Sequence, residues 1–484
     1  MPRINRPRSP IKVNELLAQA EKPIQGQEAK ELADQIYEVS SQVSPEEARR
    51  LISAADNLYA NLGGESRARG SGGATGAQLL AAEFKSGAVE ASADFFQKDL
   101  TPVQQWLFWE TNASFKEVRR PFKPVQLEVV HAPKDDVTYR GLSDGLLPND
   151  VLEVFQKSDH FAWPKHPDNT LTSLRLSVGV SVPIPYAETD GTETWKGWFT
   201  ASRSMVVETP DSNKLLSVKL PTNFPTPLQE EAHKTNLVNH TDIAVRRGSH
   251  IMDVDAKGVS HPALTLQPDV LAVFDKESKN GFTVRDISSF KDDQHLYMPG
   301  FAFPLYGPEM GMKSDDLMKE FAPIWGKSKA LLLMRYGMYL KSPHGQNTVF
   351  QLDQNRKLTG HVTLRDLSDT SFVGPIASAL GYGDKVNADR DDGYTVGEKI
   401  EEDWNLSIPG LDHDGYFSYG QLLEAKGLHD QEFIETVFAE LDKADPAYRS
   451  FQQECATLPE LQEFLFSADG QRALAEYGKK VLSL

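Results

Sequence analysis

Two polar segments of the sequence carry the side chains best suited to chemistry. The first places His344, Gln346 and Asn347 between an apolar run and a predicted strand, and Arg365 and Asp366 end the strand that returns. Histidine can donate or accept a proton, arginine can form bidentate hydrogen bonds with phosphate or carboxylate, and aspartate can bind a divalent metal. If the strands form a hairpin the two groups meet, which predicts a site for an anion and a metal. The alternative is a polar loop with a surface Arg–Asp pair.

The second segment combines hydroxyl groups with cations. Its members are Thr200, Ser202, Arg203, Ser204, Lys219, Arg246 and Arg247. Hydroxyls beside an arginine, a lysine on the next predicted strand and a further arginine pair could together hold phosphate or a tricarboxylate. Each of these residues alone is typical of a solvated surface, so only their shared β-rich setting favours a common site.

Composition limits the partners of such a site. The formal net charge is −18, because 69 Asp and Glu outnumber 51 Lys and Arg, so nucleic acid and anionic lipid are repelled. No apolar run approaches the roughly 18 residues of a membrane span. The single cysteine, Cys455, excludes an internal disulfide and is expected to be a packed hydrophobic residue. With no readable signal sequence, we expect a cytoplasmic protein with no nucleic-acid or membrane partner.

The elements that would position both segments follow from the spacing of apolar residues. Helical spacing predicts helices over residues 28–39, 45–62 and 77–117. From residue 124 onward, short alternating or β-branched runs predict strands. These runs begin at Val125 and continue over residues 171–184, 198–207, 215–220, 243–254 and 264–274. The middle third of the chain is therefore predicted to be rich in β-structure.

Helices return in the last third. Ser314 is predicted to begin a helix that Pro323 divides from a second one, which runs to about residue 341. Residues 348–352 and 361–367 flank the polar turn DQNRK as a hairpin would, and amphipathic helices predominate from about residue 372. The predicted fold class is α+β. Its three units are a mostly helical region over 1–150, a β-rich domain over 151–313 and a mainly helical domain over 314–484.

The motifs together resemble the nonribosomal-peptide-synthetase-independent siderophore synthetases, the aerobactin synthetase-like family. HGQN followed by RD is similar to that family's His-x-Gln-Asn and Arg-Asp motifs, and TASRS followed by SVKL is similar to its Ser-x-Arg-Thr and Lys-Leu segment. WPKHPDN is similar to its His-Pro-Trp-Gln segment, and the blocks follow the family's order over residues 150–370. The N-terminal region is shorter than the family's. Ala201 and Ser342 stand where the family has a hydroxyl and a Glu.

The resemblance implies a hand-shaped fold with a helical thumb, β-rich fingers and a helical palm. It also implies that ATP and Mg2+ adenylate a small polycarboxylate such as citrate, and that an amine or hydroxyl then takes the acyl group. The implied nucleotide-binding residues are Ser202, Arg203, Ser204, Lys219, Arg246, Gln346 and Asn347. The implied catalytic residues are His344, Arg365 and Asp366, with Asp366 and Asn347 as metal ligands. A homodimer is one possible assembly, which the sequence does not decide.

Two other functions fit the same residues. A diverged homologue could bind nucleotide or carboxylate without turnover, which the absent Glu at Ser342 favours. A phosphotransferase could use Arg365, Asp366 and the cationic segment for γ-phosphate transfer. The products separate these hypotheses, because adenylation releases pyrophosphate and AMP, phosphotransfer releases ADP, and a binding protein releases neither.

Overall fold

The computed structural model describes most of the chain beyond residue 100 and only short pieces before it. The described residues are 13–20, 22, 28, 31–32, 35–36, 39, 54, 100–113, 124–142, 149–167, 173–175, 181–183, 185–186, 189–200, 204–209, 214–221, 238–303, 314–340, 345, 347–400 and 419–484. The helices predicted over 28–39 and 45–62 fall largely outside these ranges. Within them, no helix has the length and apolar character needed to cross a membrane.

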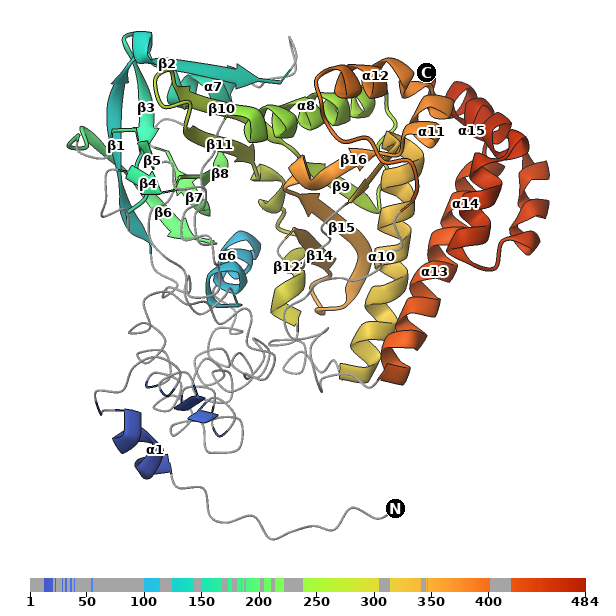
Figure 1. Ribbon diagram of the computed structural model, residues 1–484, viewed down its shortest axis with the longest axis horizontal. Coiled ribbons are helices and arrows are strands. Elements are labelled where there is room, and N and C mark those ends of the chain that lie inside the picture. Colours follow the sequence, from blue (N-terminus) through green and yellow to red (C-terminus); the bar gives the residue numbers. More distant parts are fainter. Residues whose placement is uncertain are drawn as a thin grey trace.

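A large antiparallel sheet of eight strands forms one half of the molecule (Figure 1). Its spatial order is β2-β10-β11-β8-β7-β6-β1-β3. The strands are β1 (Val125–Pro133), β2 (Val137–Gly141), β3 (His160–Pro164), β6 (Glu193–Phe199), β7 (Ser204–Glu208), β8 (Leu215–Lys219), β10 (Asp269–Asp275) and β11 (Gly281–Asp286). Because side chains alternate along a strand, one face buries residues such as Met205, Leu216 and Phe282 in a core that also includes Phe155 of α7 (Asn149–Phe155).

A smaller sheet of four strands lies in the other half of the molecule. Its order is β12 (Leu296–Pro299), β14 (Thr348–Leu352), β15 (Leu358–Arg365) and β9 (Leu264–Gln267). β14 and β15 pair antiparallel around the DQNRK turn, so the predicted hairpin is confirmed. β9 pairs with β15 in parallel.

Pro268 joins the two sheets. The single strand predicted over 264–274 is in fact β9 and β10, which belong to different sheets. Proline has no amide hydrogen for a strand ladder, so pairing ends at this residue and the chain changes sheet. As a result, Gln267 pairs with Arg365 in the small sheet while Asp269 pairs with Arg285 in the large sheet.

Two further predictions of secondary structure were wrong. The run over 243–254 is not a strand but part of α8 (Val238–Asp255), in which Arg247, Ile251 and Val254 are buried at helical spacing. Pro323 does not divide a helix, because α10 (Ser314–Tyr336) runs through it and ends before Gly337. Dense packing of α10 in the core offsets the hydrogen bond that the proline removes.

α10 lies along the small sheet on the side away from the large one, and further helices lie beyond α10 (Figure 1). α10 and α13 (Tyr419–Asp442) share one apolar core with α14 (Leu458–Phe466) and α15 (Ala468–Lys480). α14 begins with a capping box formed by Thr457 and Glu460. Cys455 is buried in the same core, as predicted.

The short elements are α1 (Val13–Ala20), β4 (Ser173–Arg175), β5 (Ser181–Pro183), α11 (Gly374–Ala377), α12 (Gly383–Asp391), and the pair β13 (Met338–Leu340) and β16 (Thr370–Phe372). The fold class is α+β, as predicted. The sheets cross both predicted domain boundaries, because β1 and β2 precede residue 150, and β9 and β12 precede residue 314. The three-unit division therefore does not coincide with the sheets.

Candidate functional site

One face of the large sheet carries polar side chains toward the small sheet. Ser204, Lys219 and Thr283 are register partners on neighbouring strands, so their side chains project from the same face. Arg285 stands two residues beyond Thr283 on β11 and shares that face. This is the face opposite the apolar core of the sheet, so it is available to meet another element.

Helix α6 (Pro102–Ala113) lies between the two sheets (Figure 1). Trp106 and Leu107 of α6 pack in one buried cluster with Trp198 and Val206 of the large sheet and Val349 of the small sheet. Burial of these large side chains stabilises the approach of the two sheets. The charged residues described next lie beside this apolar contact.

Lys219 and Asp366 form an ion pair across the two sheets. Lys219 Nζ donates to Asp366 Oδ2 at 2.9 Å and to Oδ1 at 3.1 Å, although the residues are 147 positions apart. Asp366 follows β15 in a left-handed conformation with φ of 58°, and Ser368 Oγ donates to its Oδ1 at 3.1 Å. The Lys219 and Asp366 side chains are 23% and 22% exposed, so the pair remains accessible. The two segments singled out in the sequence therefore meet here.

Arg285 adds a second cation to this pair. Its Nη2 lies 2.9 Å from Asp269 Oδ1 and 3.8 Å from Asp366 Oδ1. Burial raises the pKa of Asp269, and the Asp366 charge adds to this effect while Arg285 and Lys219 oppose it. Neither Arg285 nor Asp269 was predicted from the sequence. The sequence did contain one signal for Arg285. Residues 283–286 are Thr-Val-Arg-Asp, and residues 363–366, which include the predicted Arg365 and Asp366, have the same pattern, Thr-Leu-Arg-Asp.

Arg365 is held by an acid that the sequence did not indicate. Its Nη2 forms an ion pair with Glu110 Oε1, which also accepts from Trp106 Nε1 at 3.2 Å. Glu110 is fully buried, and burial raises its pKa although Arg365 and Trp106 lower it. Its Oε2 has no hydrogen-bond partner among the described residues. We call Lys219, Arg285, Arg365, Asp269, Asp366 and Glu110 the junction cluster.

The other predicted site residues fall in different places. Ser204 is half-buried beside Lys219, and Asn347 is buried with its carbonyl accepting from the Arg365 amide at 2.9 Å. Arg246 lies on α8, where its guanidinium forms ion pairs with Asp392 and Asp389. The four predicted residues outside the described ranges are Ser202, Arg203, His344 and Gln346. The structure thus brings Ser204, Lys219, Asn347, Arg365 and Asp366 together.

The donors proposed for a metal are consistent with Mg2+. Asp366 contributes a carboxylate and Asn347 a neutral amide oxygen, which are the hard ligands that this ion accepts. Within the described ranges, no group of three or more His, Cys, Asp and Glu could enclose an ion. Two protein ligands suit Mg2+ that keeps waters and binds through a substrate's phosphate oxygens.

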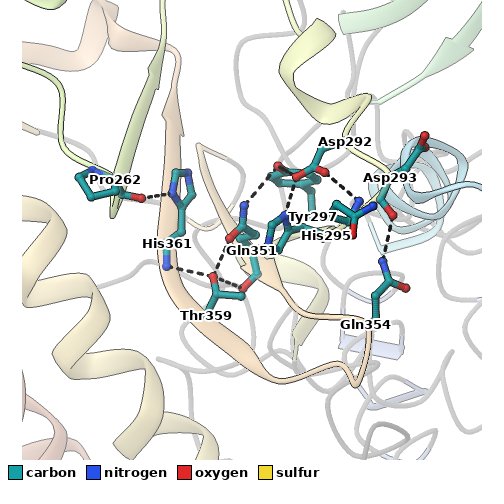
Figure 2. Close-up of polar contacts among 10 residues, drawn as sticks. Pro262, Asp292, Asp293, His295, Tyr297, Gln351, Gln354, Thr359 and His361 are labelled. Atoms are coloured by element: carbon teal, nitrogen blue, oxygen red, sulfur yellow. Dashed lines mark hydrogen bonds and ion pairs between the residues drawn. The ribbon is translucent and has the colours of Figure 1, made fainter. Parts of the chain in front are cut away.

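A polar network crosses the small sheet at the end where β15 begins (Figure 2). Thr359 Oγ1 donates to Gln351 Oε1 at 2.8 Å, and Gln351 Nε2 donates to the Tyr297 hydroxyl at 3.3 Å. Asp292 Oδ2 accepts from the Tyr297 hydroxyl at 2.9 Å and from His295 Nδ1 at 2.6 Å. These bonds hold β12, β14 and β15 together and support the strand that ends at the junction cluster.

No protein-family model matches the sequence, and no curated protein matches it. Solved structures that are similar to it include the following three. Aerobactin synthetase IucA from a hypervirulent pathotype of Klebsiella pneumoniae has 13% identity and a TM-score of 0.42, over 71% of this chain and 64% of that chain. The petrobactin biosynthesis protein AsbB from Bacillus anthracis str. Sterne also has 13% identity and a TM-score of 0.42, over 71% and 63%. An ATP-bound structure of the same IucA has 13% identity and a TM-score of 0.46, over 81% and 77%.

These similar structures include solved aerobactin synthetases, and the motifs of this sequence resemble that same family. In the first two of these matches the chain spans less than two thirds of the similar structure. All three matches have TM-scores below 0.5. Reaction, substrate and cofactor have to be argued from the chain's own residues.

Proposed function

We propose that this protein is an ATP-dependent ligase of the siderophore-synthetase type. It would adenylate a small polycarboxylate such as citrate and transfer the acyl group to an amine or hydroxyl. The contact between Lys219 and Asp366 carries the proposal, because it joins the two motif segments in one accessible cluster. An isolated surface pair within one segment would not give this arrangement.

Adenylation needs fixed cations near the phosphates, because negative charge develops at the α-phosphorus and on the leaving pyrophosphate. In our proposal Lys219 and Arg285 hold phosphate oxygens, and the Ser204 hydroxyl on the same face adds a hydrogen bond. Arg365 would orient the reacting carboxylate, since its ion pair with Glu110 fixes its guanidinium. His344, in the HGQN segment, would donate to the reacting carboxylate.

Mg2+ would be held by Asp366 and Asn347 together with the nucleotide, and it would neutralise charge on the phosphates. In the structure both Asp366 oxygens accept from Lys219. Binding of the nucleotide would therefore involve exchange of these partners. Lys219 would move to phosphate and Asp366 to the metal.

Product analysis tests the proposal. The purified protein is incubated with ATP, Mg2+ and a panel of carboxylates, citrate first, with hydroxylamine as acceptor, and pyrophosphate and AMP are measured. We expect equal amounts of both products that depend on the carboxylate. His344→Ala should lower the rate by about 10²–10³, as loss of one preorganised donor does. Formation of ADP would instead indicate a phosphotransferase, and ATP binding without any product a diverged binding protein.

A further inference from the structure

The Asp366 carboxylate occupies a position that suits a ligand's anionic group. Lys219 Nζ contacts both of its oxygens, Ser368 Oγ donates to Oδ1 at 3.1 Å, and Arg285 Nη2 lies at 3.8 Å. An ammonium, a guanidinium and a hydroxyl are the groups that proteins use to bind carboxylate or phosphate. The structure therefore contains an anion site that is filled by one of its own side chains.

We propose that Asp366 is a built-in competitor for polyanions at the Lys219–Arg285 site, and that a divalent cation relieves this competition. This inference rests on the proposed function for the identity of the natural polyanion, which would be nucleotide phosphate. It adds that metal and polyanion must enter together. A metal-free polyanion meets Asp366 already bound to Lys219, whereas a bound cation would draw the Asp366 carboxylate away.

The balance of charge supports this proposal. Lys219 and Arg285 face the carboxylates of Asp269 and Asp366, so the group has no net charge when all four are ionised. Asp269 is nearly buried and bonded to Arg285, so it is a fixed counter-ion. The Asp366 side chain is 22% exposed and is the member that can exchange. Arg285 Nε is buried without a partner in the described part of the chain, which leaves the cation with unused donor capacity.

The backbone allows Asp366 to be replaced without strain. Its φ of 58° lies in the left-handed region, which asparagine and glycine adopt readily. Asp366→Asn removes the charge and keeps the shape, and Asp366→Gly provides a second variant if the first folds poorly. Both should leave Lys219 and Arg285 without their exchangeable counter-ion.

The chain supplies a matched control in Asp286. It ends β11 after Arg285 as Asp366 follows Arg365, its Oδ2 accepts from Lys214 Nζ at 2.7 Å, and its side chain is 20% exposed. Its Oδ1 accepts from the Ser288 amide at 2.9 Å, the Ser288 hydroxyl also bonds to it, and Lys214 is the cation paired with it among the described residues. Asp286→Asn removes the same charge from a similar Lys–Asp pair outside the proposed anion site.

The experiment measures binding of pyrophosphate, citrate and ATP by calorimetry, in EDTA and again in Mg2+. In EDTA we expect Asp366→Asn to bind pyrophosphate at least tenfold more tightly than the wild type, and Asp286→Asn to match the wild type. Mg2+ should strengthen ATP binding to the wild type and have little effect on Asp366→Asn. Equal or weaker pyrophosphate binding by folded Asp366→Asn and Asp366→Gly in EDTA would overturn the inference.

Failure of the proposed function has a different signature. If Asp366→Asn gains pyrophosphate affinity but no carboxylate yields pyrophosphate and AMP from ATP in the wild type, the competitor role stands and the ligase assignment is wrong. If the wild type makes both products but Asp366→Asn gains no affinity, the ligase stands and the competitor role is wrong.

Discussion

Two strands of this protein end in the same pattern, Thr-x-Arg-Asp, yet they make different contacts. Residues 283–286 end β11 in the large sheet, and residues 363–366 lie at the end of β15 in the small sheet. In both, the arginine pairs with a buried acid and the aspartate pairs with a lysine. The sequence signature is therefore equal at the two places, and only the surroundings distinguish them.

The surroundings differ in what lies across from the aspartate. Asp286 accepts from Lys214 and from the Ser288 amide, and Lys214 directly precedes the strand next to β11, so the contact closes within one sheet. Asp366 has a left-handed backbone, bonds a lysine of the other sheet and lies 3.8 Å from Arg285. The Asp286 contacts lie within one sheet and stabilise the end of a strand. The Asp366 contact joins two sheets and lies near two cations, where another anion can replace the carboxylate.

The largest effect is expected from Glu110, which forms a buried ion pair with Arg365 of the β15 pattern. Glu110→Ala leaves the Arg365 guanidinium buried without its counter-ion, so we expect about 3–5 kcal/mol of lost stability. Urea unfolding of the wild type and the variant measures it. Arg365→Met should restore part of the loss in the double variant, because the orphaned charge is then gone. Strictly additive losses would mean that the two residues do not act as a pair.

The next effect separates the two lysines by ligand binding. Lys219→Met should weaken ATP binding in Mg2+ by about 1.5–3 kcal/mol, the usual contribution of a charged hydrogen bond. Lys214→Met should leave ATP binding unchanged, because Lys214 pairs with Asp286 and Asp150 away from the junction cluster. Calorimetric titration of both variants measures the difference. Equal weakening in the two variants would remove the functional distinction between the patterns.

Local regularities made part of this site predictable. Alternating apolar residues and the DQNRK turn specified the hairpin that carries Asn347 and Arg365, since strand pairing between neighbours follows from local pattern. The resemblance to the siderophore synthetases also implied one site for Lys219 and Asp366, and their contact agrees with this. Where pairing partners are close in sequence, periodicity alone was sufficient.

The remaining features depend on contacts between distant parts of the chain. Glu110 contacts Arg365 from a helix whose residue spacing indicates only apolar packing. At Pro268 one apolar run of the sequence is divided between strands of two different sheets. Arg246 was predicted at the phosphates, but acids after and within α12 are its ion-pair partners. The β-branched residues over 243–254 suggested a strand, and burial around α8 outweighed that propensity. Each of these features is determined by tertiary packing between distant parts of the chain.

The smallest expected effects are those of the two aspartates on stability, and the effect of Asp286 depends on pH. Burial would raise the pKa of Asp286, but hydrogen bonds from Lys214 and Ser288 outweigh burial and hold the pKa below its ordinary value of 3.8. A carboxyl with a lowered pKa in the folded state stabilises the fold above pH 3.8, and this contribution is lost as the pH falls through the folded-state pKa.

Asp286→Asn should therefore cost about 1 kcal/mol at pH 7, the usual contribution of a partly exposed pair, and less as the pH falls below 3.8. Urea unfolding at pH 7 and in steps down to pH 3 measures the difference between the two proteins. Asp366→Asn is the informative companion, because removing a carboxylate that Asp269 repels offsets part of the lost Lys219 contact. We expect its cost at pH 7 to be smaller than that of Asp286→Asn. A larger loss of stability would mean that Asp366, like Asp286, acts mainly by stabilising the fold.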